Sequence, residues 1–186
     1  MNDPEIRNSL VKSYFKKFKS DNCLLLEELA VLNGSSIADI VLISKIFNQA
    51  FEIKSARDSL SRLEKQIDDY ILVFDYVTVI TQASHYDDVE RIVPPFVGIF
   101  LIYDDESFDY VRKASASPYL KKEKIVKLLW KNEIYSFLRS KGYSKISSLR
   151  ISKLEKILCE NFSLKEIKEI LFDSFKKREN WKRKMV

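Results

Sequence analysis

The sequence predicts a mixed α/β protein, and three observations carry the prediction. Segments 37–43 and 49–55 are apolar and rich in β-branched residues, which is typical of strands. Segment 57–74 repeats apolar residues at helical spacing, and segment 76–80 (Tyr-Val-Thr-Val-Ile) is again strand-like. From Pro118 onward the pattern is helical. We therefore expect a mixed sheet with helices packed on it and an appended helical region at the C-terminal end.

The first half of the chain begins with two predicted helices, near residues 5–19 and 22–32. The second is predicted from its apolar run Leu24-Leu25-Leu26 and from Leu29. The polar residues 44–49 have the length of a hairpin connection between the first two strands, although no Asn-Gly or Asp-Gly pair fixes the turn type and the register stays open. Ser55 and Asp58 have the spacing of a capping box, which predicts that the next helix begins there.

In the second half, we expect a short helix at 86–92 and strands at 97–103 and 108–112. Helices are expected at about 119–140 and 149–160, and the capping box from Ser163 to Glu166 opens the last one. Trp130 lies at helical spacing from apolar neighbours, so we expect it in the core.

Length and composition fit a single domain over residues 1–186, with a core of about 22–112 and a helical region of about 113–186. Apolar residues make up 46% of the chain, which is ordinary for a globular core. Two cysteines and one histidine are too few for a disulfide framework or a histidine-based metal cluster. Since we find no apolar signal segment and no apolar run long enough to span a membrane, we expect a cytoplasmic protein without membrane contact.

The candidate catalytic residues begin with Asp39 on the first strand and with Glu52 and Lys54 on the second. Residues two apart in a strand share a face, so Glu52 and Lys54 point the same way. Two converging carboxylates and the backbone carbonyl of Ile53 suit Mg²⁺ or Mn²⁺ with positions left open. Such an ion activates water and neutralises charge on a phosphate, while Lys54 orients the attacking water.

The helix that follows adds Gln66 and Tyr70, one turn apart, with Arg62 one turn earlier, at the border of the apolar stripe. Taken singly, each of these residues is equally well explained as ordinary surface. Taken together they are not, because unpaired charges at Asp39 and Glu52 would be costly among Ile, Val, Leu and Phe.

In this order, Asp39, Glu52-x-Lys54 and Gln66-x-x-x-Tyr70 resemble the motifs of the PD-(D/E)XK nuclease superfamily, in the branch with RecB-type exonucleases. Further matching positions resemble a group of small, largely uncharacterised bacterial proteins of that superfamily; they include Gly34, Phe51, Asp58, Leu60, Phe74 and Asp75. Two departures are Ala38, in place of the proline that names the motif, and Ile37, where relatives often carry an arginine.

The resemblance implies an αβββαβ restriction-endonuclease-like core with a divalent metal held by Asp39 and Glu52. It also implies that Lys54 assists catalysis and that an acid on a helix lies near the metal. From the residues alone this acid is Glu27 or Glu28, and the resemblance favours Glu28. Gln66 and Tyr70 would position the DNA strand or the catalytic lysine.

Charge points to nucleic acid as the partner, since the net charge is +5 and basic residues cluster within 12–19, 121–131 and 176–184. Lysine-rich helix faces are also common as plain solvated surface. Trp181 in the last cluster is a candidate for base stacking. The nucleic-acid-binding residues that we expect are Ser55, Arg57, Arg62, Lys176, Lys177, Arg178, Trp181, Lys182 and Arg183.

The sequence as a whole thus predicts a Mg²⁺- or Mn²⁺-dependent deoxyribonuclease, a hydrolase acting on phosphodiester bonds. The alternative is a non-catalytic nucleic-acid-binding or assembly protein that keeps the nuclease-like fold. A protein partner or a second copy that completes the site also stays open, as do the choices between exo- and endonuclease and between DNA and RNA.

Overall fold

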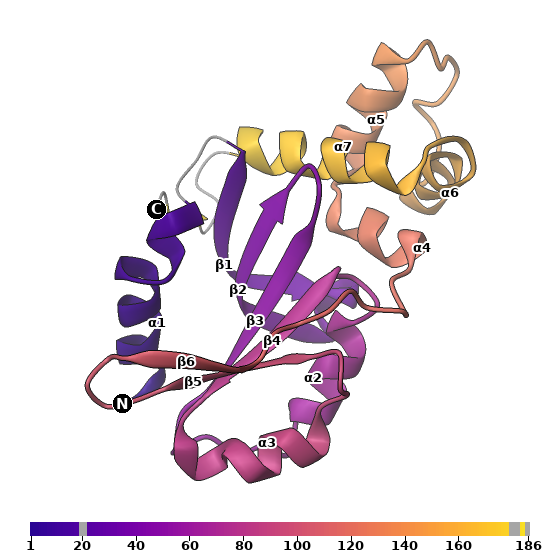
Figure 1. The fold of residues 1–186 in the computed structure, drawn as a ribbon. Helices are drawn as coiled ribbons and strands as arrows, with labels where there is room; N and C mark the ends of the chain where they lie inside the picture. Colours follow the sequence, from indigo (N-terminus) through magenta and orange to yellow (C-terminus); the bar gives the residue numbers. More distant parts are fainter. Residues whose placement is uncertain (19–21, 179–182, 185–186) are drawn as a thin grey trace.

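A seven-stranded mixed sheet forms the centre of the computed structural model, which describes residues 1–18, 22–178 and 183–184 (Figure 1). Its strand order is β6-β5-β4-β3-β2-β1-β7. Strands β1, β2 and β3 are antiparallel neighbours, β4 runs parallel to β3, β5 runs parallel to β4, and β6 is antiparallel to β5. The strands are β1 (Cys23–Val31), β2 (Ser36–Ser44), β3 (Asn48–Lys54), β4 (Tyr76–Thr81), β5 (Gly98–Ile102), β6 (Phe108–Arg112) and the short edge strand β7 (Arg183–Lys184).

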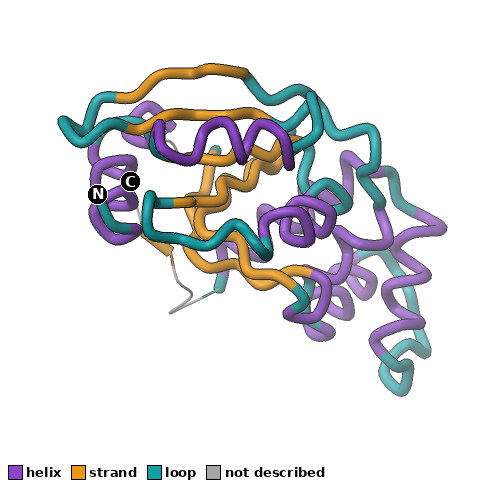
Figure 2. Tube along the Cα trace, turned by 90° about the horizontal axis from the view of Figure 1, so that it is seen from below, coloured by secondary structure: helices purple, strands orange, loops and turns teal. Residues whose placement is uncertain are grey.

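Helices cover both faces of this sheet and extend from one end of it (Figures 1 and 2). They are α1 (Asp3–Lys12), α2 (Leu63–Tyr70), α3 (Tyr86–Ile92), α4 (Lys122–Ile125), α5 (Lys131–Ser140), α6 (Ile151–Asn161) and α7 (Leu164–Lys177). Short 3₁₀ helices lie at Phe15–Phe18, Leu32–Gly34, Ala83–His85 and Val126–Leu128. Within the described residues, none of the helices combines the length and apolarity needed to cross a bilayer.

Alternation along the strands divides the buried side chains into two cores. One core packs Ile6 and Leu10 of α1 against Leu42 of β2 and Phe51 of β3. The other packs α2, α3 and the C-terminal helices against the remaining strand positions, such as Val41. Because successive strand residues point to opposite faces, a sheet covered on both sides needs apolar residues at successive positions, as β2 has.

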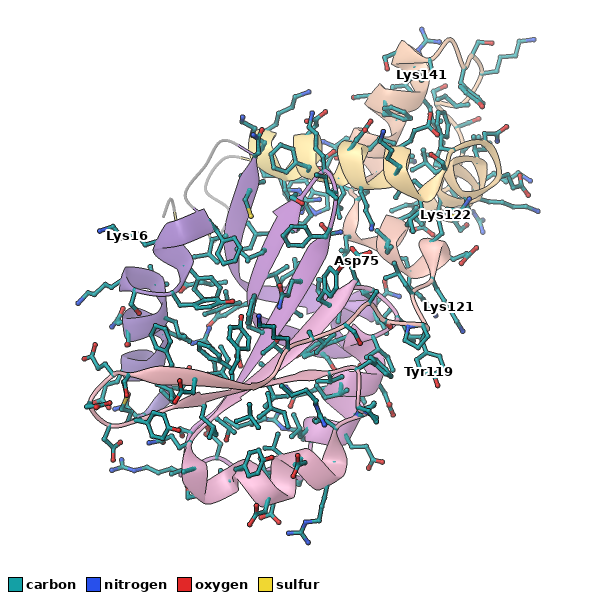
Figure 3. The ribbon with its side chains drawn as sticks, in the orientation of Figure 1. Lys16, Asp75, Tyr119, Lys121, Lys122 and Lys141 are labelled. Carbon is teal, nitrogen blue, oxygen red and sulfur yellow. The ribbon has the colours of Figure 1, made fainter. Side chains whose placement is uncertain are left out.

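The C-terminal helices dock on the sheet through α7, which packs against β1 and β2. Lys168 of α7 pairs with the carboxylate of Asp75 and donates to the carbonyl oxygen of Ile46 at 3.2 Å. Figure 3 shows Asp75 at the end of the sheet that faces these helices. One apolar core therefore continues from the sheet into the C-terminal region.

Several predicted elements are confirmed. The antiparallel pair β2–β3, the strands β4, β5 and β6, and the helices α3 and α6 lie within a few residues of their expected positions. The predicted capping box also forms, because the Ser163 side chain caps the backbone of Glu166 and the Glu166 side chain returns to the Ser163 N–H. The coarse prediction of a mixed α/β sheet with C-terminal helices is thus correct.

The predicted helix at 22–32 is wrong, because this segment is β1. Leucine favours helices in isolation, but tertiary context overrides that weak preference. Leu25 lies in the core on the α1 side of the sheet and Leu26 in the core on the α2 side, so the leucine run supplies side chains to both cores. The first predicted helix, 5–19, is also shorter than expected and ends at Lys12.

The predicted helix over 57–74 begins later, at Leu63. The expected bond between Ser55 and Asp58 does form, with the Ser55 N–H donating to the Asp58 carboxylate at 2.7 Å. It closes an isolated turn instead of opening a helix, since the Asp58 N–H donates back to the Ser55 carbonyl at 3.0 Å and non-helical residues follow.

The predicted helix over 119–140 is interrupted at Leu129 and Trp130, which have extended backbone between the 3₁₀ turn at Val126–Leu128 and α5. Trp130 is 46% exposed, so the prediction that it lies in the core is wrong. Leu128 and Leu129 are both buried, and the extended backbone between the two helical segments lets neighbouring side chains turn inward.

Candidate active site

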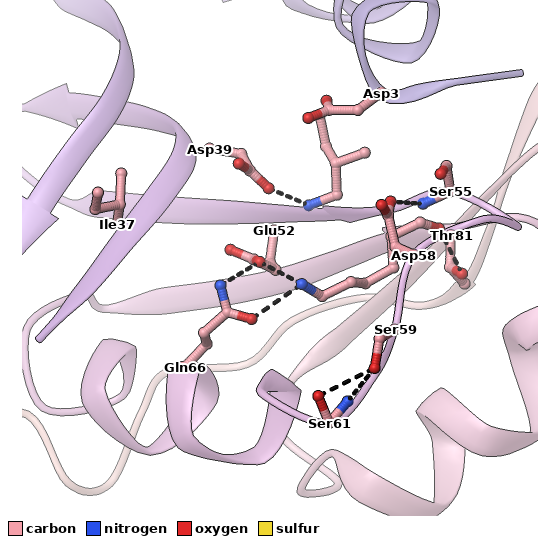
Figure 4. Close-up of polar contacts among 12 residues, drawn as sticks. Asp3, Ile37, Asp39, Glu52, Ser55, Asp58, Ser59, Ser61, Gln66 and Thr81 are labelled. Atoms are coloured by element: carbon pink, nitrogen blue, oxygen red, sulfur yellow. Dashed lines mark hydrogen bonds and ion pairs between the residues drawn. The ribbon is translucent and has the colours of Figure 1, made fainter.

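The site lies where strands β2 and β3 separate. Their last paired residues are Ile40 and Phe51, so Asp39 and Glu52 stand opposite each other just beyond the ladder. The backbone N–H of Ile53 donates to Asp39 Oδ2 at 2.8 Å, which satisfies a donor on the β2 side of β3. Figure 4 shows Asp39 and Glu52 on their neighbouring strands, with Gln66 approaching from α2.

Glu52 is the centre of a buried hydrogen-bond network and is only 2% exposed. Lys54 Nζ donates to Glu52 Oε1 at 2.8 Å, and Gln66 Nε2 donates to the same oxygen at 2.6 Å. The Tyr70 hydroxyl lies 2.8 Å from Glu52 Oε2 and 2.7 Å from the carbonyl oxygen of Ile37, so its proton is shared between two acceptors. Gln66 Oε1 also accepts from Lys54 Nζ at 2.9 Å, which closes a triangle of three side chains.

Burial dominates the electrostatics of the two acids. It raises the pKa of Glu52 to about 7, and the negative charge of Asp39 adds to this effect, while Lys54 opposes it. Burial also raises the pKa of Asp39, against the lowering influence of the Arg7 charge. The pKa of Tyr70 is raised by burial and by the Glu52 carboxylate, so its hydroxyl stays protonated and remains a donor.

Arg7 of α1 also joins the site, although no motif or spacing in the sequence predicts it. Its Nη2 donates to Asp39 Oδ1 at 2.6 Å and its Nη1 to the Asp39 carbonyl oxygen at 2.9 Å. Asp3, one turn earlier on α1, holds the same guanidinium through Nε at 2.7 Å and Nη2 at 3.1 Å. A hydrogen bond across 32 residues leaves no periodic trace in a sequence.

Glu28 lies on β1 and not on a helix, which corrects the prediction from the resemblance. The antiparallel pairs Glu27–Ile40 and Leu29–Ala38 flank it, so Glu28 stands opposite Asp39. Its φ of 52° interrupts the strand, and Leu26 and Leu29 consequently enter the same core despite their odd spacing. A non-glycine residue with this φ is costly and is often found at functional sites.

A cavity of about 570 Å³ joins these residues. Its walls include Glu28, Asp39, Glu52, Ile53, Lys54, Arg62, Lys65 and Gln66. Every predicted catalytic or metal-binding residue except Tyr70 therefore lines one cavity, and Tyr70 lies beneath it in contact with Glu52. In the part of the chain that the structure describes, no group of three or more His, Cys, Asp or Glu side chains is close enough together to hold a metal ion.

The predicted nucleic-acid contacts are divided by the structure. Arg62 lines the cavity, whereas Arg57 is exposed outside its walls and Ser55 is 2% exposed within the turn described above. Lys65, which belongs to none of the sequence motifs, also lines the cavity and pairs with Asp69 at 2.9 Å.

The predicted contact by Arg178 is wrong, because this residue is 5% exposed and serves the fold. Its Nε and Nη2 donate to the two carboxylate oxygens of Glu133, both at 2.7 Å, and its guanidinium lies 4.2 Å from the Trp130 ring centre. Lys176 and Lys177 are exposed on α7, and Arg183 belongs to β7. Trp181 and Lys182 lie outside the described residues.

Two of the basic clusters, those within 12–19 and 121–131, lie apart from each other. Figure 3 shows Lys16, in the 3₁₀ helix that follows α1, on one side of the molecule, whereas Lys121 and Lys122 lie at the start of α4 on the other side.

Comparison with known proteins identifies the family of this chain. Residues 1–185 match the family model described as Bacteriophage P4 protein cII. The chain belongs to this family. Protein cII of Enterobacteria phage P4 is 28% identical over 181 residues, which cover 96% of this chain and 68% of that relative. No solved structure matches the chain at a significant level.

The protein cII family name states no activity. Neither match concerns the nuclease superfamily, so that resemblance stays a prediction. What the chain does must therefore be argued from its own side chains.

Proposed function

We propose that this member of the protein cII family is a divalent-metal-dependent nuclease that hydrolyses phosphodiester bonds in DNA. The observation that carries the proposal is the convergence of Asp39, Glu52 and Lys54 at the fork of β2 and β3, with Gln66 fixing the lysine and the glutamate together. These residues come from three elements and share one cavity with Arg62. A buried acid–lysine pair is costly to stability, and such a pair in the wall of a cavity is a candidate functional site.

The order of the elements supports the same proposal. Helix α1, strands β1, β2 and β3, helix α2 and strand β4 follow one another as αβββαβ, which is the order that the resemblance implies. The three-stranded antiparallel unit and the parallel β4 agree with a nuclease-like core.

The donor set fits Mg²⁺ or Mn²⁺. Asp39 and Glu52 would hold the ion, with the Ile53 carbonyl oxygen as a further donor, because Mg²⁺ commonly needs only one or two carboxylates beside water and phosphate. Glu28 lines the same cavity, but among the described residues it does not join the other two acids in a three-acid group. The raised pKa of Glu52 fits as well, because two neighbouring buried carboxylates repel each other and a cation relieves that repulsion. When bound, such an ion lowers the pKa of water and neutralises charge on the phosphate.

Other side chains of the protein would orient the reacting groups and contact the DNA. Lys54 Nζ, held by Glu52 and Gln66, offers its third proton to the attacking water or to the phosphate oxygen that gains charge. Tyr70 keeps Glu52 oriented by hydrogen bonding to its Oε2. Arg62 and Lys65 at the cavity wall would contact flanking phosphates, so DNA would enter from the exposed side of α2.

The test is cleavage of supercoiled, linear and single-stranded DNA by purified protein with Mn²⁺, with Mg²⁺ or with a chelator. We expect cleavage that the chelator abolishes and that Asp39→Ala and Lys54→Ala each reduce by on the order of 10³-fold or more. Lys113→Ala is the matched control, because Lys113 is exposed and does not line the site cavity. Retained activity in a folded Asp39→Ala/Lys54→Ala double variant would reject the proposal.

One observation favours the second candidate, a nucleic-acid-binding protein that does not cut. The Arg7 guanidinium already neutralises Asp39, at 2.6 Å, and a site satisfied in this way needs no metal. DNA binding that is unchanged by chelator, with no cleavage under any metal, would favour this candidate. The double variant Lys176→Ala/Lys177→Ala, which keeps the buried Arg178, should then weaken binding most at low salt.

A further inference from the structure

Arg7 contacts the Asp39 carboxylate oxygen that a metal ion bound to Asp39 would also use. Its guanidinium contacts Asp39 Oδ1 at 2.6 Å, and both side chains are largely enclosed, with 16% and 18% of their surfaces exposed. Of its five N–H groups, one on Nε, one on Nη1 and both on Nη2 have acceptors on Asp3 or Asp39. A guanidinium that is saturated in this way has little capacity left for a phosphate.

Helix α1 holds Arg7 firmly in this position. The Asn2 side chain caps the helix through the Glu5 N–H at 3.0 Å, and the Glu5 side chain returns the bond to the Asn2 N–H at 2.8 Å. Ile6 and Leu10 anchor the helix, since both are fully buried in the core on that face of the sheet. The backbone of Arg7 is therefore fixed beside the site, while its side chain divides its donors between Asp3 and Asp39.

We propose that Arg7 is the internal counter-cation of the Asp39 site, and that it sets the affinity of this site for divalent metal by competing for Asp39 Oδ1. The inference rests on the proposed function, because it assumes that Asp39 is a metal ligand. A guanidinium and a divalent cation on one carboxylate repel each other, so the metal binds only as Arg7 withdraws toward Asp3. Asp3 holds two of the guanidinium nitrogens and gives the displaced charge a partner.

The experiment is calorimetric titration of Mn²⁺ alone into the wild-type chain and into Arg7→Gln, without DNA. We expect Arg7→Gln to bind Mn²⁺ roughly tenfold more tightly or better, since a hydrogen bond to a charged group is worth about that factor or more in an equilibrium constant. Arg7→Lys should give an intermediate affinity, because it keeps the charge but loses the forked contact. It also carries the test if Arg7→Gln does not fold.

Two controls separate the possible failures. Arg91→Gln removes an arginine that pairs with Asp88 on α3, away from the cavity walls, and should bind Mn²⁺ as the wild type does. Asp39→Asn should abolish the binding. If Mn²⁺ binds the wild type and Arg7→Gln equally, or binds Arg7→Gln more weakly, Arg7 is not a competitor, and the proposed nuclease site survives. If no form of the chain binds Mn²⁺, the metal site and this inference fail together.

Discussion

The buried carboxylate of Glu52 lowers the stability of the fold, although the proposed function requires it. Its carboxylate is 2% exposed beside Asp39, and three donors, Lys54, Gln66 and Tyr70, keep it in place. Those hydrogen bonds offset the cost of burial only in part, since the pKa of Glu52 is still raised to about 7. A side chain optimised for stability alone would be apolar at this position.

The raised pKa of Glu52 predicts how stability depends on pH in the absence of metal. The pKa of Glu52 is about 7 in the folded chain against an ordinary 4.5, so the folded state binds more protons between these values. The contribution of this group to the free energy of unfolding is therefore highest below about pH 4.5 and is lost as the pH rises through about 7, a fall of on the order of 3 kcal/mol. Glu52→Gln should remove most of this fall.

Urea unfolding with a chelator at about pH 5 and about pH 7.5 measures the effect in both chains. Glu64→Gln, at an exposed position of α2, is the control and should keep the wild-type dependence. An unchanged pH dependence in Glu52→Gln would show that the carboxylate is ionised in the folded chain throughout this range.

At the same scale, local patterns predicted most of the site. Asp39 and Glu52 were placed on neighbouring strands because β2 and β3 have clear strand compositions, and Gln66 and Tyr70 on one helix face because they are one turn apart. Arg7 could not be predicted, because its contact with Asp39 depends on how α1 crosses the sheet. Tertiary contacts of this kind have no period to detect.

At the scale of elements, β1 is the clearest failure of local patterns. The leucine run and its two glutamates favour a helix from the sequence alone. The segment is a strand because both faces of the sheet are covered there, so successive leucines can all be buried. The consequence for the site is direct, because a strand, unlike a helix, brings Glu28 opposite Asp39 through backbone pairing. The φ of 52° at Glu28 was equally invisible, since nothing in its neighbours requires it.

The end of α7 gives a prediction that separates a structural cation from surface cations. Arg178 is buried against Glu133, and its guanidinium packs on the Trp130 and Phe175 rings. Arg178→Ala should therefore lower the free energy of unfolding by about 3 kcal/mol, because it leaves the Glu133 carboxylate without its cationic partner. Lys176→Ala/Lys177→Ala removes exposed charges and should change stability by less than about 1 kcal/mol.

DNA binding should instead be affected by the double variant Lys176→Ala/Lys177→Ala, which has the smaller effect on stability. If α7 contacts phosphates, the double lysine variant lowers the slope of log affinity against log salt by about 2, with little preference for sequence. Filter binding across a salt series, together with urea unfolding, measures both quantities. Equal salt slopes for the double variant and the wild type would exclude Lys176 and Lys177 from the interface.

At the scale of the whole molecule, the helical region after β6 shares one core with the sheet. Leu154, Leu158 and Phe175 of the C-terminal helices belong to the same buried cluster as Val41 and Val79 of the strands. The buried Lys168–Asp75 pair crosses this boundary as well. The predicted helical appendage is therefore not a separate layer that touches the sheet only at its edge.

This shared core predicts cooperative unfolding. The two tryptophans, at positions 130 and 181, both lie in the C-terminal region, so intrinsic fluorescence reports on that region, whereas far-ultraviolet circular dichroism reports on the whole fold. We expect the two urea transitions to coincide, because neither part can lose its half of the core alone. Lys168→Met should shift both midpoints together to lower urea, since it leaves the Asp75 carboxylate unpaired. Two separated midpoints in the wild-type chain, or a Lys168→Met variant that moves only the fluorescence transition, would mean that the C-terminal helices fold as an independent unit.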